Sequence, residues 1–161
     1  MTVVNNLHEQ HGELLELARR IASLLDADKL PDGCTAVRLN LSAFARKLRV
    51  HLSLEDRFVC EHLLRHSDPA VVTRVTHHQA EMRSLRNRVT DYAEKWMSAE
   101  VEIQKKPAQF VEATKTILDL ASKRFELEER DLYPLVEQIL SPSGTWPLDL
   151  MSDADETRSA G

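Results

Sequence analysis

The segment TAVRLNLSAFARKLRVHLSLEDRFVCEH, residues 35–62, has the apolar spacing of a single long helix. Its stripe begins at Val37 and continues through Leu48 at intervals of three or four residues, which places these side chains on one helical face. At the end of the stripe, His51 and Glu55 stand where further leucines are expected. The segment therefore predicts a helix that directs an imidazole and a carboxylate toward a protein core.

Three other segments show the same spacing, at residues 7–25, 69–96 and 107–140. Asp68 as a cap, with Pro69 in the first turn, is a typical helix start, and Pro107 plays the same part later in the chain. Thr35 is predicted to cap the segment quoted above. The pattern breaks between residues 97 and 106.

Long amphipathic helices joined by short connections pack most simply as antiparallel neighbours. We therefore predict an all-α chain, with an up-down antiparallel four-helix bundle over residues 1–140. The remainder, residues 141–161, mixes proline, glycine, serine and acids without periodicity. This composition predicts a mostly flexible tail.

Composition agrees with one helical domain and argues against several partners. The chain has 161 residues, 42% of them hydrophobic, with only four glycines and a net charge of −5. Acids and bases are interleaved, whereas nucleic-acid binding needs clustered basic residues. No apolar run approaches the ~20 residues of a membrane span, and the N-terminal stretch lacks a secretion signal. We expect a cytoplasmic protein without nucleic-acid or membrane partners, in which Cys34 and Cys60 are reduced thiols.

Five polar residues interrupt the apolar stripes: His11, His51, Glu55, Arg124 and Glu128. Burying an unpaired carboxylate costs several kcal/mol unless a cation or hydrogen bonds compensate. Histidine and glutamate four residues apart project from adjacent turns of one helix face and can bind one ion together. When several helices of a bundle direct such residues inward at one level, the usual result is a two-metal centre bridged by carboxylates.

Each of these residues also has a structural interpretation. His51 and Glu55 can form a buried hydrogen bond, although metal ligation explains better why other helices carry matching residues. His11 can equally be a core histidine, with His8 as a second candidate for its role. His77 and Glu81 have ligand spacing, but Glu81 flanks its helix's stripe and can equally be solvated.

Four motifs together resemble the hemerythrin-like proteins with the HHE cation-binding domain, over roughly residues 5–140. They are LHEQHGELL from residue 7, HLSLEDRF from residue 51, HHQAEM from residue 77 with Tyr92 and Trp96 beyond it, and ELEERDLYPL from residue 126. The resemblance implies a four-helix bundle around a non-haem di-iron centre that meets oxygen, nitric oxide or oxidants. By position it implies these metal ligands: His11, His51, Glu55, His77, Glu81 and Glu128.

Two residues depart from the family pattern. Arg124 stands four residues before Glu128, where the family often has a histidine, and arginine cannot deprotonate to bind metal. Glu81 also stands where many members have histidine, so the implied site is rich in oxygen donors and suits iron or manganese. In one interpretation Arg124 orients Glu128, which still bridges two metals. In the other, Arg124 pairs with Glu128 and leaves one weakly held metal or none.

The leading hypothesis is a cytoplasmic hemerythrin-like protein whose iron centre, of two ions or one, binds or reacts with oxygen, nitric oxide or peroxide. Sensing, storage and detoxification all remain open as its purpose. The alternative is a metal-free or zinc-stabilised helical interaction module with a degenerate site. An enzyme such as a peroxidase would depend on the metal, since no nucleophile–base pair is evident. A homodimer or another protein partner is left open.

Overall fold

The computed structural model describes residues 2–139, without the side chains of residues 31–33, and every regular element among them is a helix. The elements are α1 (Val3–Leu24), α2 (Leu30–Glu55), η1 (Asp56–Cys60), α3 (Glu61–Leu63), α4 (Pro69–Trp96), α5 (Glu100–Lys105), α6 (Pro107–Leu127), η2 (Glu128–Leu132) and α7 (Tyr133–Ile139). None of these helices combines the length and the apolar character that crossing a membrane requires. The predicted tail, residues 141–161, lies outside the described residues.

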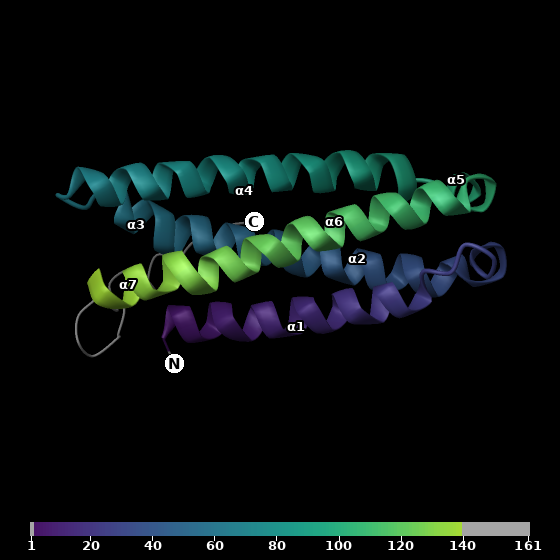
Figure 1. The fold of residues 1–161 in the computed structure, drawn as a ribbon, viewed down its shortest axis with the longest axis horizontal. Helices are drawn as coiled ribbons and strands as arrows, with labels where there is room; N and C mark the ends of the chain where they lie inside the picture. Colours follow the sequence, from purple (N-terminus) through teal and green to yellow (C-terminus); the bar gives the residue numbers. More distant parts are fainter. Residues whose placement is uncertain (1, 140–161) are drawn as a thin grey trace, which may run out of the picture.

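The long helical segments lie along a common axis (Figure 1), and the element order gives four of them. Two of them are the single helices α1 and α4, and the other two are continuous runs, from α2 to α3 and from α6 to α7. The sequence colours show that the chain reverses direction from each long segment to the next. The short helix α5 connects α4 to α6 at one end of the molecule.

The predicted helix starts are confirmed at two of three positions. The Asp68 side chain accepts a hydrogen bond from the Ala70 N–H at 2.9 Å, and α4 begins at Pro69. The helix α6 begins at Pro107. The predicted cap at Thr35 is wrong, because α2 begins five residues earlier at Leu30.

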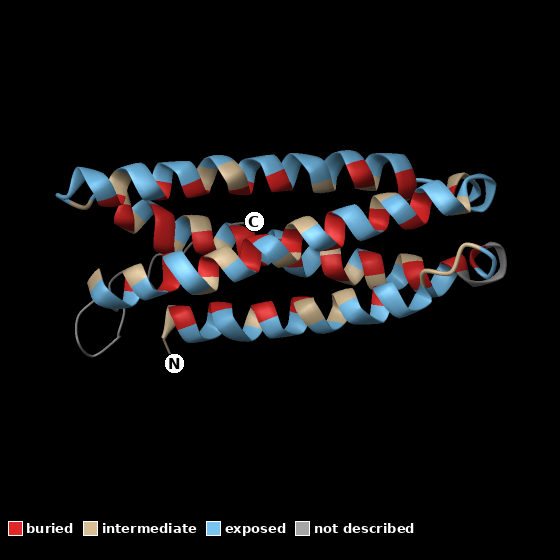
Figure 2. Cartoon of the chain, viewed as in Figure 1, coloured by how far each residue is buried: buried red, intermediate tan, exposed pale blue. Residues whose placement is uncertain are grey.

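The apolar stripes form a common core. Buried residues line the facing sides of the long segments, and exposed residues cover their outer sides (Figure 2). The five polar residues predicted to point inward are buried with them: His11, His51, Glu55, Arg124 and Glu128. The core is therefore apolar along most of its length and strongly polar at one level.

Two π-helical turns change which residues face this core. In η1 the Glu61 N–H bonds to the Asp56 carbonyl, and in η2 the Tyr133 N–H bonds to the Glu128 carbonyl, so each turn contains one extra residue. Val59 and Cys60 within η1 and Leu63 in α3 are fully buried. An uninterrupted α-helix would have continued the stripe of His51 and Glu55 at Phe58 and His62, and the extra residue of η1 is why the buried face moves.

Away from the polar level, a buried hydrogen bond between Tyr92 and Thr114 links α4 to α6. Substitutions of this pair test whether the two helices pack as described. The Thr114 hydroxyl donates to the Phe110 carbonyl at 2.7 Å, which leaves its oxygen to accept from the Tyr92 hydroxyl at 2.6 Å. We predict that Tyr92→Phe lowers the free energy of unfolding in urea by about 1 kcal/mol. Thr114→Val should cost about 1–3 kcal/mol, because it leaves a buried hydroxyl without its acceptor.

The double variant provides the control for this pair. Either substitution alone already removes the hydrogen bond between Tyr92 and Thr114. The double variant should therefore lose less free energy of unfolding than the sum of the two single losses. Strictly additive losses would show that Tyr92 and Thr114 do not interact in solution.

Candidate metal centre

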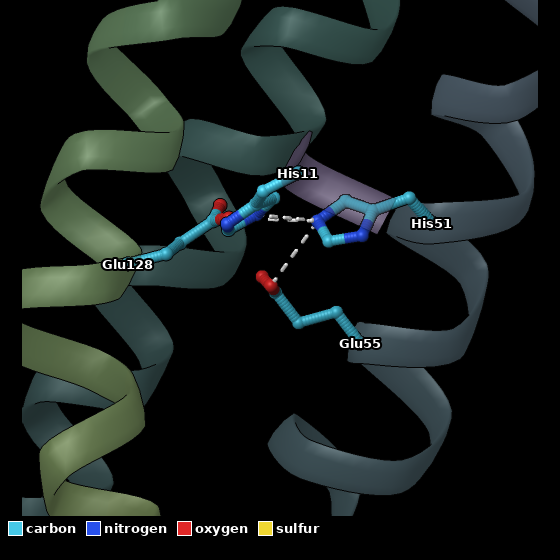
Figure 3. A group of neighbouring side chains, drawn as sticks. All are labelled: His11, His51, Glu55 and Glu128. Carbon is cyan, nitrogen blue, oxygen red and sulfur yellow. Dashed lines mark hydrogen bonds and ion pairs between the residues drawn. The ribbon is translucent and has the colours of Figure 1, made fainter. Parts of the chain in front are cut away.

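Four buried side chains from three elements meet at the polar level of the core. His11 comes from α1, His51 and Glu55 from α2, and Glu128 from the start of η2. Figure 3 shows all four pointing toward one another. One ligand atom from each residue lies within 4.8 Å of the other three. These four are among the six predicted ligands, and they form one compact cluster.

The shortest contacts in the cluster join the Nε2 atoms and the carboxylates. His11 Nε2 lies 3.1 Å from His51 Nε2 and 2.8 Å from Glu128 Oε2. His51 Nε2 lies 3.6 Å from Glu55 Oε2 and 3.5 Å from Glu128 Oε2. Donors at about 2.1 Å from one ion lie about 3.4 Å apart when they are arranged tetrahedrally. The spacing therefore suits a shared cation.

The imidazoles of His11 and His51 each form a second contact through the ring nitrogen that faces away from the cluster. His51 Nδ1 lies 3.0 Å from Gln10 Oε1, and His11 Nδ1 lies 2.6 Å from Glu129 Oε1. Both oxygens are acceptors, so both Nδ1 atoms carry the proton. In a neutral imidazole this arrangement leaves the lone pair on Nε2, the atom that faces the cluster. Such partners orient metal-binding histidines and increase their affinity.

The other oxygen of the Glu129 carboxylate lies 2.5 Å from His8 Nδ1. His8 is about two-fifths exposed and Glu129 about one-third, so this carboxylate connects the buried His11 to the protein surface. His8 was considered as an alternative to His11, and the structure places it outside the cluster, on the solvent side of Glu129.

Tyr133 supports Glu55 from the opposite helical segment. Its hydroxyl donates to Glu55 Oε2 at 2.9 Å and lies 3.2 Å from His11 Nε2. Residues five apart do not share a face of an α-helix, but the π-turn η2 places Tyr133 above Glu128. The extra residue in η2 therefore brings both a carboxylate and a phenol into the site.

His77 and Glu81, the other two predicted ligands, lie outside the cluster. The side chain of His77 is 75% exposed and that of Glu81 is 42% exposed, and they contact each other at 3.3 Å. The neighbouring His78 is buried instead and lies 2.5 Å from Glu55 Oε1 through Nε2. The physical reason is helical phase, because His78 shares the inward stripe of α4 with Met82 and Leu85, and His77 does not.

The sequence contained a signal for His78 but none as clear for the other supporting residues. His78 belongs to the apolar stripe of its helix, and that phase would have selected it over His77. Gln10 and Glu129 directly precede or follow a ligand in sequence, yet their contacts run between different helical segments. The inward position of Tyr133 could not be predicted without knowing that the helix contains the π-turn η2.

Burial and neighbouring charges act against each other in this site. Burial by itself disfavours the charged form of His11, but hydrogen bonds and charges from Glu128 and Glu129 outweigh it and raise the pKa of His11. For Glu128, burial opposes ionisation, but hydrogen bonds and charges from His11 and His51 hold its pKa far below the usual range. The site therefore keeps its carboxylate charged and attracts a cation, either a proton on His11 or a metal ion.

Two nearby groups remain protonated. Burial is the main reason that the pKa of Tyr133 is raised, and the charges of Glu55 and Glu128 raise it further. Burial likewise raises the pKa of the Cys60 thiol, with added effects of Glu55 and Asp56. Tyr133 is therefore a hydrogen-bond donor, and Cys60 does not supply a thiolate ligand.

The donor set fits a transition metal. Two imidazoles with carboxylate ligands form the mixed nitrogen and oxygen environment that non-haem iron and zinc both use. Metal binding would displace the proton that His11 otherwise holds, because a ligand must offer its lone pair.

Glu129 provides a test of the support behind His11. We predict that Glu129→Ala weakens metal affinity by about 10- to 100-fold, because the imidazole loses the acceptor that fixes its orientation. The affinity is measured by titrating chelator-treated protein with metal. Glu126→Ala is the matched control, since Glu126 is an exposed neighbour on the same helical segment. An equal loss of affinity in both variants would contradict a specific role for Glu129.

Comparisons with known proteins agree with this geometry. The family described as the hemerythrin HHE cation-binding domain matches residues 2–136, which include all four residues of the cluster. No curated protein and no solved structure matches the chain significantly. The family match extends over most of the chain and confirms the resemblance found in the four motifs. The chain belongs to the hemerythrin HHE cation-binding domain family.

Proposed function

We propose that this protein is a non-haem iron protein that binds or reacts with oxygen, nitric oxide or peroxide, and that its four long segments form the family's up-down bundle. The observation that carries the proposal is the convergence of two imidazoles and two carboxylates, all buried, within 4.8 Å. Family membership supports cation binding independently.

Iron is favoured by the chemistry of the donors. Two histidines and a carboxylate are the usual ligands of non-haem ferrous iron, and they leave positions on the ion for a small molecule. A bound ferrous ion would supply the electrons that reactions with oxygen, nitric oxide or peroxide require. Zinc and manganese accept similar donors.

The protein residues have separable roles in this proposal. His11, His51, Glu55 and Glu128 would hold the ion. Tyr133 holds the Glu55 carboxylate through its hydroxyl, and the apolar core excludes bulk water from the ligands. Buried, pre-oriented donors of this kind bind an ion without large rearrangement of the chain.

A second candidate function is a metal-free or zinc-stabilised interaction module. The observation that favours it is that the carboxylates have protein partners. Glu55 accepts from His78 and Tyr133, and Glu128 contacts His11 and Arg124. With a proton on His11, these hydrogen bonds satisfy the cluster without a metal. This alternative predicts that a chelator leaves thermal stability unchanged, or that zinc stabilises the protein without oxygen-dependent colour.

We predict that His51→Ala removes most of the bound iron, whereas His77→Ala retains it. His51 Nε2 faces the cluster and is fully buried, but the His77 side chain is 75% exposed. Each protein is loaded with ferrous iron without air, desalted and analysed for iron. Circular dichroism checks that the helices remain formed. Ultraviolet and visible spectra are then recorded after adding oxygen, nitric oxide or peroxide.

The wild type and His77→Ala should hold iron and change their spectra with at least one of these small molecules. Less than about half an ion per wild-type chain would exclude the iron proposal, because buried metal ligands of a folded site bind stoichiometrically. Equal iron in wild type and His51→Ala would show that the metal binds elsewhere. Stable iron binding without any spectral response would leave a metal site but remove the proposed reactivity.

A further inference from the structure

The Arg124 guanidinium contacts one oxygen of Glu128, and His11 and His51 contact the other. Its Nε donates to Glu128 Oε1 at 3.1 Å, and its two terminal nitrogens contact Glu81 Oε2 and His78 Nδ1. Arg124 is almost fully buried. It therefore contacts groups from both α4 and η2 directly beside the four-residue cluster.

Arg124 also determines which nitrogen of His78 carries the proton. A guanidinium has only donors, so His78 Nδ1 must accept from it. The proton of the neutral His78 ring is then on Nε2, which donates to Glu55 Oε1 at 2.5 Å. His11 and His51 have the opposite tautomer, because acceptors hold their Nδ1 protons. Of these three buried imidazoles, His78 is the one whose outer nitrogen accepts from a cationic donor, which keeps its proton on the inward nitrogen.

The atoms that could bind a second ion are therefore already used. Glu128 Oε1 accepts from Arg124, Glu55 Oε1 accepts from His78, and Glu81 Oε2 is paired with Arg124. Among the described residues, the group of His11, His51, Glu55 and Glu128 is the arrangement with metal-binding geometry. The other carboxylate oxygens, Glu55 Oε2 and Glu128 Oε2, lie 3.6 Å and 3.5 Å from His51 Nε2.

We propose that the protein holds one metal ion per chain and that the Arg124 guanidinium, together with the His78 Nε2 proton, takes the place of a second ion. This inference rests on the proposed metal-binding function and specifies the number of ions. It combines the two sequence-based interpretations of Arg124, since Glu128 contacts Arg124 through one oxygen and offers the other to the metal.

Arg124 places one positive charge in direct contact with the fully buried Glu128 carboxylate before any ion binds. A second divalent ion would have to enter beside a fixed guanidinium and would be repelled by it.

The inference is tested by counting iron ions. Chelator-treated wild type, Arg124→His and Arg74→His are titrated with ferrous iron without air, and bound iron per chain is measured by elemental analysis. Arg74→His is the matched control. Arg74 lines the same surface cavity of about 250 Å³ as Arg124 and His78, but its guanidinium contacts the Asp131 carbonyl rather than the buried carboxylates. Both substitutions replace arginine by the same imidazole.

We expect one ion per chain for wild type and Arg74→His, and two for Arg124→His, because that substitution removes the guanidinium and adds an imidazole four residues before Glu128. Two ions in wild type would overturn this inference while leaving the proposed iron function in place. No ion in wild type would overturn both. A folded Arg124→His variant that still binds one ion would show that Arg124 does not limit the number of ions.

If circular dichroism shows that Arg124→His is unfolded, the number of ions bound by the wild type decides whether the one-ion proposal holds.

Discussion

The structure depends on the burial of two carboxylates, Glu55 and Glu128, inside an otherwise apolar helical core. Neither side chain has any measurable exposure, and an unpaired charge in such an environment would destabilise the fold by several kcal/mol. Their oxygens contact His11, His78, Arg124 and Tyr133, which come from three of the long helical segments. The long segments must therefore meet at one level for the acids to be tolerated.

The two π-turns contribute to the burial of the same two carboxylates. The segments HLSLEDR, from residue 51, and RFELEER, from residue 124, share a Leu-Glu pair followed by an acid and an arginine, and in each the helix widens at the glutamate or directly after it. π-Turns are less favourable than α-helical turns and are frequently found at functional sites. Here the turn at Glu128 brings Tyr133 onto the same face, so the local backbone change supplies a hydrogen-bond donor to the opposite acid.

The difference between the two copies makes the site asymmetric. His51 and Arg124 occupy equivalent positions, four residues before Glu55 and Glu128. His51 faces His11 with a nitrogen that can bind metal, whereas Arg124 donates to its glutamate and to His78. One side of the carboxylate pair is therefore suited to a cation from solution, and the other side already has a cation built into the chain.

The sequence by itself determined the helical class, the polar level in the core and the central residues His11, His51, Glu55 and Glu128, because apolar spacing along a helix reports directly which side chains face inward. Tertiary structure decided which residues support them. The apolar stripe of α4 contained the signal for His78 over His77, but only the packed helices show that His78 contacts Glu55. Contacts of Gln10, Glu129 and Tyr133 join segments far apart in sequence or cross a π-turn, and a local pattern carries no information about either. Hydrogen-bond direction, and with it the tautomer of each imidazole, is set by partners that only the packed helices bring together.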